Sequence, residues 1–269
     1  METIELNTWE EFLELIKKRR SNFRFIRNVC EDNQLVPVGL YRGQANAEWT
    51  LQTTLERYLN RNIPINKYLN RIEKVSNLIT TCRDKKWDVS DLNDNKDLNE
   101  KIRTLEFMAY LRQNGFPSPL LDWTRSPYIA TFFAVKDCLL QKKNKNDKNK
   151  ESRFAIYLYP HALNQMIYPY VRKLGHSIAT DRKHYLQQCE YTFCLDKSDT
   201  EIVFANHEST LQNQLVGNNC TKYTIPDSDA LKILEILDEM NINDYSLFES
   251  ESALMSTLAQ RHLADLRAD

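Results

Sequence analysis

Glycine, proline and paired cysteine motifs are scarce in this chain. It has 5 glycines and 8 prolines among 269 residues, and it contains no glycine-rich dinucleotide fingerprint. No cysteine pair forms a CxxC motif, and no group of His and Cys has the spacing of a zinc site. We therefore expect free thiols in a reducing compartment, no metal site and no tightly bound cofactor. The cysteines are Cys30, Cys82, Cys138, Cys189, Cys194 and Cys220.

Long apolar runs and an excess of one charge are also absent. The formal net charge is -1, so the chain as a whole lacks the basic surface of a general nucleic-acid binder. No apolar run approaches the roughly 20 residues of a membrane-spanning helix. The residues after Met1 do not form the basic and then apolar region of a signal peptide. We expect a cytoplasmic protein with no membrane contact, and nucleic acid is not favoured as a partner.

The hydrophobic fraction of 42% is enough for a real core, and its pattern mixes helices and strands irregularly. Helical spacing of apolar residues predicts helices over 8–29, 51–59, 64–87, 99–114, 128–140, 227–240 and 250–266. Short apolar or alternating runs predict strands over 35–44, 120–121, 154–160, 184–196, 200–206 and 221–226.

This order does not suit a regular alternation of strand and helix. It predicts a single α+β domain with a mixed or antiparallel central sheet packed by helices. We expect an N-terminal helical segment over 1–34, the α+β domain over 35–250 and a C-terminal helix over 251–269. The helix-rich region of about 51–114 reads as a helical insertion in that domain.

The first motif is "YRGQ", at the end of a predicted strand. A rigid strand can aim the Arg42 guanidinium at an anion, and its fork suits a phosphate or a carboxylate. Gly43 lets the chain turn or lets a ligand approach closely. Alternatively, Arg42 is structural and ties down a loop carbonyl or a buried Asp.

The second motif is "LLDWTRSP" at 120–127, where a buried strand gives way to a helix. Asp122 lies where the chain leaves the sheet, and Ser126 before Pro127 is typical of a helix start. The free N–H groups of such a junction suit an anion, and Trp123 and Thr124 would then line the pocket. Alternatively, Asp122 pairs with Arg42 or Arg125, and Ser126 only caps the helix.

The third motif is the predicted strand over 184–196. Alternation would place Gln188 and Glu190 on the same face, roughly 7 Å apart, with Gln187 on the other face. An amide and a carboxylate at this spacing can contact one ligand. The alternative is a solvated polar face opposite an apolar one.

Together the motifs resemble the FRG domain family, which is named for its Phe/Tyr-Arg-Gly motif. The resemblance rests on "YRGQ" with Trp49, on the block "QNGFPSPLLDWTRSPYIATFFA" at 113–134, and on "KHYLQQCEYT" at 183–192. Gln113 stands where the family usually has His, and Ser118-Pro119 stands for Thr-Arg. The family name carries no agreed activity.

The order of the motifs also resembles the arginine–serine–glutamate layout of ADP-ribosyltransferases. That resemblance implies NAD as a substrate, with Arg42 on a phosphate and Thr124 or Ser126 in the nicotinamide pocket. Glu190 would stabilise an oxocarbenium-like transition state, because a carboxylate stabilises positive charge that develops beside it. The catalytic prediction is Glu190, Arg42 and Asp122, and the ligand-binding prediction is Gly43, Gln44, Trp123, Thr124, Ser126, Gln187 and Gln188.

Three functions remain open from the sequence. The first is an NAD-consuming transferase or glycohydrolase with a nucleotide or small-molecule ligand and a protein target, an effector or toxin in bacterial conflict or phage defence. The second is a nucleic-acid-acting enzyme in which Asp122 and Glu190 hold Mg²⁺. The third is a non-catalytic sensor in which Arg42 and Asp122 form a buried structural pair.

Overall fold

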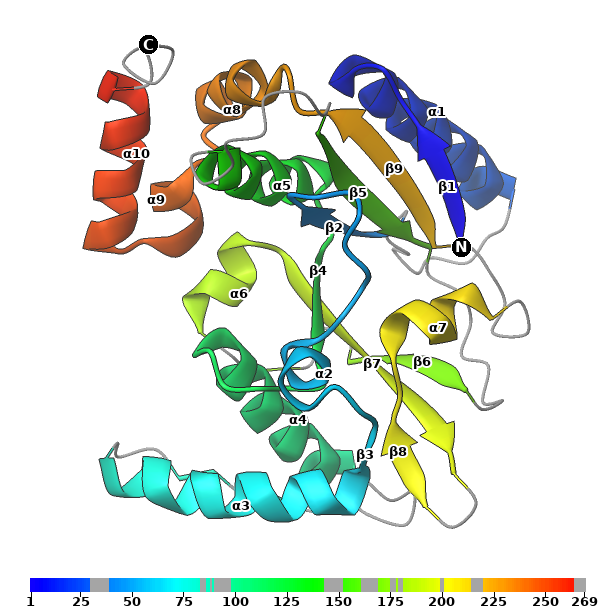
Figure 1. Ribbon diagram of the computed structural model, residues 1–269, viewed down its shortest axis with the longest axis vertical. Coiled ribbons are helices and arrows are strands. Elements are labelled where there is room, and N and C mark those ends of the chain that lie inside the picture. Colours follow the sequence, from blue (N-terminus) through cyan, green and yellow to red (C-terminus); the bar gives the residue numbers. More distant parts are fainter. Residues whose placement is uncertain are drawn as a thin grey trace.

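Nine strands form one mixed sheet through the described part of the chain (Figure 1). The computed structural model describes residues 1–29, 39–82, 86–87, 89, 98–142, 152–160, 169–174, 178, 181–198, 201–213 and 220–263. The strands are β1 (Glu2–Glu5), β2 (Leu40–Gln44), β3 (Ile63–Pro64), β4 (Leu121–Thr124), β5 (Arg153–Tyr159), β6 (Tyr170–Lys173), β7 (Cys189–Lys197), β8 (Ile202–Phe204) and β9 (Thr221–Pro226).

The sheet order is β1-β9-β5-β2-β4-β7-β8-β3, and β6 pairs with β7 beside this path. β1 runs parallel to β9, and the other described pairs are antiparallel. The fold is therefore a single α+β domain with a mixed sheet, as the sequence predicted.

Helices pack on this sheet in two groups. They are α1 (Trp9–Val29), α2 (Thr54–Leu59), α3 (Ile65–Cys82), α4 (Leu98–Gln113), α5 (Pro127–Lys142), α6 (Arg182–Leu186), α7 (His207–Gln212), α8 (Ala230–Glu239), α9 (Asp244–Phe248) and α10 (Glu251–Leu263). In Figure 1, α1, α5 and α8 lie at one end of the molecule, and α3 and α4 lie at the other.

The structure confirms the predicted long helices within the described residues. Local chemistry explains three of their ends. The hydroxyl of Thr8 accepts the N–H of Glu11 at the start of α1. The hydroxyl of Ser126 accepts the N–H of Ile129, so Ser126 caps α5 ahead of Pro127. Gly115 follows α4 with a φ of 84°, the left-handed conformation that ends helices.

The prediction of one strand over 184–196 is wrong in its first half. Asp181 accepts the N–H of Lys183 through its side chain and caps the short helix α6. Gln188 then takes a φ of 50°, and β7 begins only at Cys189. Gln188 and Glu190 therefore do not share a strand face. Strands β1, β3 and β6 and helices α7 and α9 were not predicted.

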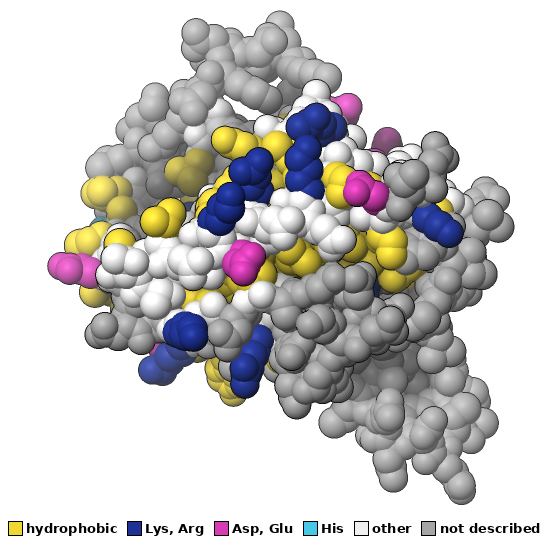
Figure 2. Space-filling model, turned by 90° about the horizontal axis from the view of Figure 1, so that it is seen from below, with side chains coloured by type: hydrophobic (Ala, Val, Ile, Leu, Met, Phe, Trp, Pro, Cys, Tyr) yellow, Lys and Arg dark blue, Asp and Glu magenta, His cyan; other side chains and the backbone are white. Residues whose placement is uncertain are grey.

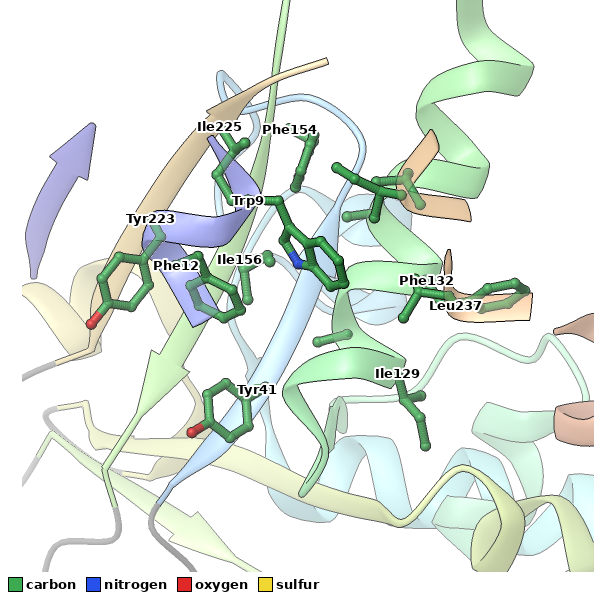
Figure 3. Close-up of a cluster of buried hydrophobic side chains, with 14 of the residues drawn as sticks. Trp9, Phe12, Tyr41, Ile129, Phe132, Phe154, Ile156, Tyr223, Ile225 and Leu237 are labelled. Carbon is green, nitrogen blue, oxygen red and sulfur yellow. The ribbon is translucent and has the colours of Figure 1, made fainter. Parts of the chain in front are cut away.

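The two faces of the sheet are closed by different partners. α1, α5 and α8 bury alternate residues of β5 and β9, and the helices contribute Trp9, Phe12 and Phe132 to this cluster (Figure 3). α3 and α4 cover residues of β7, with Tyr191 and Phe193 among them. On the opposite face of the sheet, the other alternate residues of β5 and β4 form a third cluster. The loop after β2 and helix α7 cover this cluster.

The approach of β2 to α5 is unusually close. A Cβ atom added to Gly43 would lie 1.9 Å from the carbonyl oxygen of Ala130 and 2.9 Å from the backbone nitrogen of Ala134. Only glycine permits this contact, because the opposing atoms are helix backbone and cannot rotate away. The motif glycine is thus explained by helix packing.

The face that carries α3 is polar. Figure 2 shows Lys and Arg side chains on this face interspersed with polar and hydrophobic ones. Lys67, Arg71 and Lys74 of α3 are exposed there. No described helix is long and apolar enough to cross a bilayer.

We expect Gly43→Ala to destabilise the protein by about 2 kcal/mol or more, because overpacking a tight contact typically costs about 1–3 kcal/mol. Urea unfolding measures the free energy, and Asn70→Ala on the exposed face of α3 is the matched control. A Gly43→Ala variant as stable as that control would show that β2 and α5 can separate without cost.

Candidate functional site

A cavity of about 340 Å³ opens between the two helical groups, above β2, β4 and β7. α5 supplies one wall and the end of α4 supplies another, while α6 and α9 stand at its mouth. This volume is at the small end of the range of about 300–1,000 Å³ for ligand sites. The lining residues are Tyr41, Arg42, Gly43, Arg112, Gln113, Asp122, Trp123, Thr124, Ala130, Phe133, Asp137, Lys183, Gln187, Cys189, Tyr191 and Phe248.

Arg42 enters the cavity where β2 and β4 separate. The two strands are in register only at Tyr41 and Thr124. Beyond that point Nη1 of Arg42 donates to the carbonyl oxygen of Asp122 at 2.9 Å and bridges the strands. The pKa of Arg42 is lowered to about 10, mainly by burial. The negative charge of Asp122 raises this pKa, and the positive charge of Arg112 lowers it further. The guanidinium is still charged at neutral pH.

The carboxylate of Asp122 pairs with Arg112, at 2.5 Å from Nη2 to Oδ2. The two partners that the sequence suggested, Arg42 and Arg125, do not hold this carboxylate. Arg112 is brought here by the last turn of α4, ahead of Gly115. The pair is about 20% and 33% exposed, so it is open to the cavity.

Buried polar atoms without a partner gather at this end of the cavity. Nε of Arg42, Nε of Arg112, Oδ1 of Asp122 and Oε1 of Gln113 have no hydrogen-bond partner among the residues that the structure describes. The other polar atom of Gln113, Nε2, donates to the hydroxyl of Tyr191 at 2.9 Å. Such atoms in native proteins call for a ligand, an ion or water. Two donors and two acceptors that belong to lining residues are therefore buried without a partner in the described chain.

The cavity is lined by more basic than acidic side chains. Arg42, Arg112 and Lys183 are basic, and Asp122 and Asp137 are acidic. Desolvation raises the pKa of Asp137, while Lys136 and Arg42 oppose the rise. Even with both carboxylates ionised the lining is positive, which favours an anionic ligand.

Thiolate chemistry is disfavoured in this cavity. Burial, with Asp122 and Glu190 nearby, raises the pKa of Cys189 to about 12. The group therefore stays a neutral thiol at physiological pH and is a poor nucleophile.

Hydrogen bonds hold the mouth of the cavity to its floor. The hydroxyl of Thr124 donates to the carbonyl of Gln187 at 2.7 Å and accepts the N–H of Ser126 at 3.1 Å. Nε2 of Gln187 donates to the carbonyl of Leu247 at 3.1 Å, which ties α6 to α9. Arg182 and Glu249 add an exposed ion pair between the same helices.

The structure gathers some predicted site residues and separates others. Arg42, Gly43, Asp122, Thr124 and Gln187 line the cavity, as does Trp123, whose side chain shares the far face of the sheet with Glu190. Gln44 donates to the carbonyl of Thr50, Ser126 caps α5, and the carbonyl of Gln188 accepts the N–H of Arg125. The side chains of Gln44, Ser126 and Gln188 do not line the cavity.

Glu190 lies on the far side of the sheet. In the register of β4 and β7, Asp122 is opposite Tyr191 and Trp123 is opposite Glu190. Directly opposed residues share a face, so the Glu190 side chain points away from Asp122. It lies 3.6 Å from Nζ of Lys173, and it is not part of the cavity lining.

A buried polar network occupies that far side. Nε1 of Trp123 donates to the hydroxyl of Thr192 at 2.8 Å, and this hydroxyl lies 3.3 Å from Nε2 of His207. Nδ1 of His207 lies 3.2 Å from Glu56, which also closes the capping box of α2. Burial of the imidazole lowers the pKa of His207, but Cys194 and Glu56 outweigh this and raise it to about 10. This network braces β4 from behind.

Sequence reasoning missed several lining residues. Arg112 and Gln113 were visible as polar residues in the last turn of a helix. Phe133, with Ala130 and Asp137, follows the helical period on the cavity side of α5. Phe248 lies on a short helix that the sequence did not indicate. Among the described residues, no group of three or more His, Cys, Asp and Glu could hold a metal ion.

These observations define an α+β protein with a positively charged pocket where two central strands diverge. The family model of the FRG domain matches residues 38–148. The chain therefore contains an FRG domain, and the YRGQ motif and the block around Asp122 lie within the match. Searches of curated proteins and of solved structures found no match to this chain.

The raised pKa of His207 predicts how stability depends on pH. The unfolded imidazole has a pKa of about 6.5, so this contribution is complete below about pH 6.5. It is lost as the pH rises toward the folded value of about 10. We expect the free energy of unfolding to fall across this window in the wild type. In His207→Gln the free energy of unfolding should lack this fall with pH. An equal fall in the wild type and in the variant would contradict the raised pKa of His207.

Proposed function

We propose that the pocket binds a phosphate-bearing, nucleotide-type ligand. The observation that supports this is the pair of guanidiniums from Arg42 and Arg112 at Asp122, where Arg42 binds the backbone carbonyl and Arg112 binds the carboxylate. Each guanidinium keeps a buried Nε–H without a partner in the described chain. Guanidinium forks match the geometry of phosphate, and they are strongest in a partly desolvated site.

NAD is the substrate that we propose, and the reaction is cleavage of its bond between ribose and nicotinamide. Nicotinamide leaves as a neutral molecule with the bonding electrons, and positive charge develops at the ribose carbon. Water or a protein side chain then adds to that carbon and releases a proton. A fixed carboxylate stabilises the developing charge. Asp122 takes this role in our proposal, in place of Glu190.

Asp122 suits this role for geometric reasons. Oδ2 is held by Arg112, which fixes the orientation of the carboxylate, and Oδ1 is buried without a partner in the described chain. In our proposal the ligand supplies that partner. A group that is held in place before reaction costs no reorganisation in the transition state. The biological role that we propose is that of an NAD-consuming effector in bacterial conflict or phage defence.

A non-catalytic sensor is the second candidate. The bridge from Arg42 to the carbonyl of Asp122 favours it, because this bond also holds β2 to β4 at the point where they diverge. In a sensor the same pocket would bind the ligand without turnover. Binding without loss of NAD would therefore identify this function.

Turnover of NAD by purified variants tests the proposal. We expect Asp122→Asn to lower kcat by about 100-fold or more, on the scale of losing one electrostatic contact to a transition state. Glu190→Gln should keep kcat within about threefold of the wild type, because its carboxylate lies on the other face of the sheet. Release of nicotinamide gives the rate, and thermal melting of each variant checks the fold.

Exposed Arg125→Gln, next to the motif, is the control for charge loss near the pocket. Loss of activity in Glu190→Gln together with full activity in Asp122→Asn would overturn the assignment of Asp122. A wild-type protein that binds NAD but never releases nicotinamide would favour the sensor.

A further inference from the structure

The lining of the cavity has two parts with different chemistry. We call the part with Arg42 and Arg112 the floor, and the part with Phe133, Asp137 and Phe248 the mouth. Phe133 of α5 and Phe248 of α9 both line it, with ring centroids 6.1 Å apart and planes at 86°. Both rings are only partly buried. Two rings at a right angle form an apolar corner, and a flat ring can pack against the face of either one.

An acceptor stands beside this corner. Asp137 lies four residues after Phe133 on α5, and both line the cavity. Residues at this spacing have Cβ atoms about 5–6 Å apart on one helix face. A ring packed on Phe133 therefore brings its edge within reach of the Asp137 carboxylate, which can only accept hydrogen bonds when ionised.

We infer that the mouth of the pocket selects a planar heteroaromatic ring that carries an exocyclic NH₂ donor. This inference rests on the proposed function, since the ring must be joined to the phosphate that Arg42 and Arg112 hold. Two parts of NAD have this chemistry, the carboxamide of nicotinamide and the amino group of adenine. A cavity of about 340 Å³ has room for one nucleotide half, so one of the two rings occupies the mouth.

The selecting residues come from two different parts of the chain. Phe133 and Asp137 lie within the FRG match at 38–148, as do Arg42 and Arg112. Phe248 lies about a hundred residues beyond it, and Lys183 and Gln187 also lie outside. Of the strands under the pocket, β2 and β4 therefore lie within the family match, while β7 and Phe248 come from the segment that follows.

Dissociation constants for five probes test the inference on the full chain. Ribose 5-phosphate reports on the floor alone. Nicotinamide mononucleotide and nicotinic acid mononucleotide differ only in an amide or an acid at the ring. Adenosine and inosine monophosphate differ in whether the purine carries an amino donor or a carbonyl acceptor.

We expect the donor-bearing member of at least one pair to bind about tenfold tighter than its partner, the scale of one charge-assisted hydrogen bond. Asp137→Asn should reduce that ratio to about twofold or less. Phe248→Ala should weaken the preferred nucleotide about five- to tenfold, the scale of one aromatic contact, and leave ribose 5-phosphate unchanged. Tyr245→Ala, on the same helix but exposed and outside the lining, is the matched control.

The outcomes separate the two proposals. If ribose 5-phosphate does not bind, or if Arg42→Gln binds it as well as the wild type, the phosphate site is wrong. If ribose 5-phosphate binds but neither pair shows a preference, or if the preference survives in Asp137→Asn, the ring selection is wrong. A preference in the nicotinamide pair agrees with the role of Asp122 at the nicotinamide ribose. A preference in the adenosine pair alone would leave the ring selection standing and overturn that role.

Discussion

The contact between Gly43 and the backbone of α5 is the constraint on which the pocket depends. Because β2 lies directly against Ala130 and Ala134, the helix crosses the sheet at a fixed height and angle. That position sets Phe133 and Asp137 at one side of the cavity. The neighbouring Arg42 is placed by the same strand at the divergence from β4. The absence of a side chain at Gly43 thus determines where these three side chains meet.

The sequence could predict the parts of this site that depend on short-range rules. The capping by Ser126 and the helix end at Gly115 follow from neighbours within a few residues. Glu190 could not be placed, because its face depends on where β7 begins. The cap at Asp181 and the positive φ of Gln188 move that start to Cys189. The residue of β4 that shares a face with Glu190 is then set by the register of β4 and β7, which no local sequence pattern encodes.

The same reasoning explains why the partner of Asp122 was missed. Arg112 precedes it by ten residues, and the chain turns back at Gly115 before it enters β4. Only the packing of α4 against β7 brings the two side chains together. The buried network of Trp123, Thr192, His207 and Glu56 likewise joins four separate segments. The polar groups of this network are satisfied across long sequence distances, which single-sequence patterns do not report.

The parallel pairing of β1 with β9 has a consequence for the order in which the sheet forms. Glu2 is opposite Thr221, so the first strand to be synthesised waits for almost the last one. Loop closure over such a length is slow compared with the local pairing of β7 and β8. During synthesis β1 therefore stays unpaired until β9 has left the ribosome. The strands between them can pair earlier, so the parallel edge is the last part of the sheet to form.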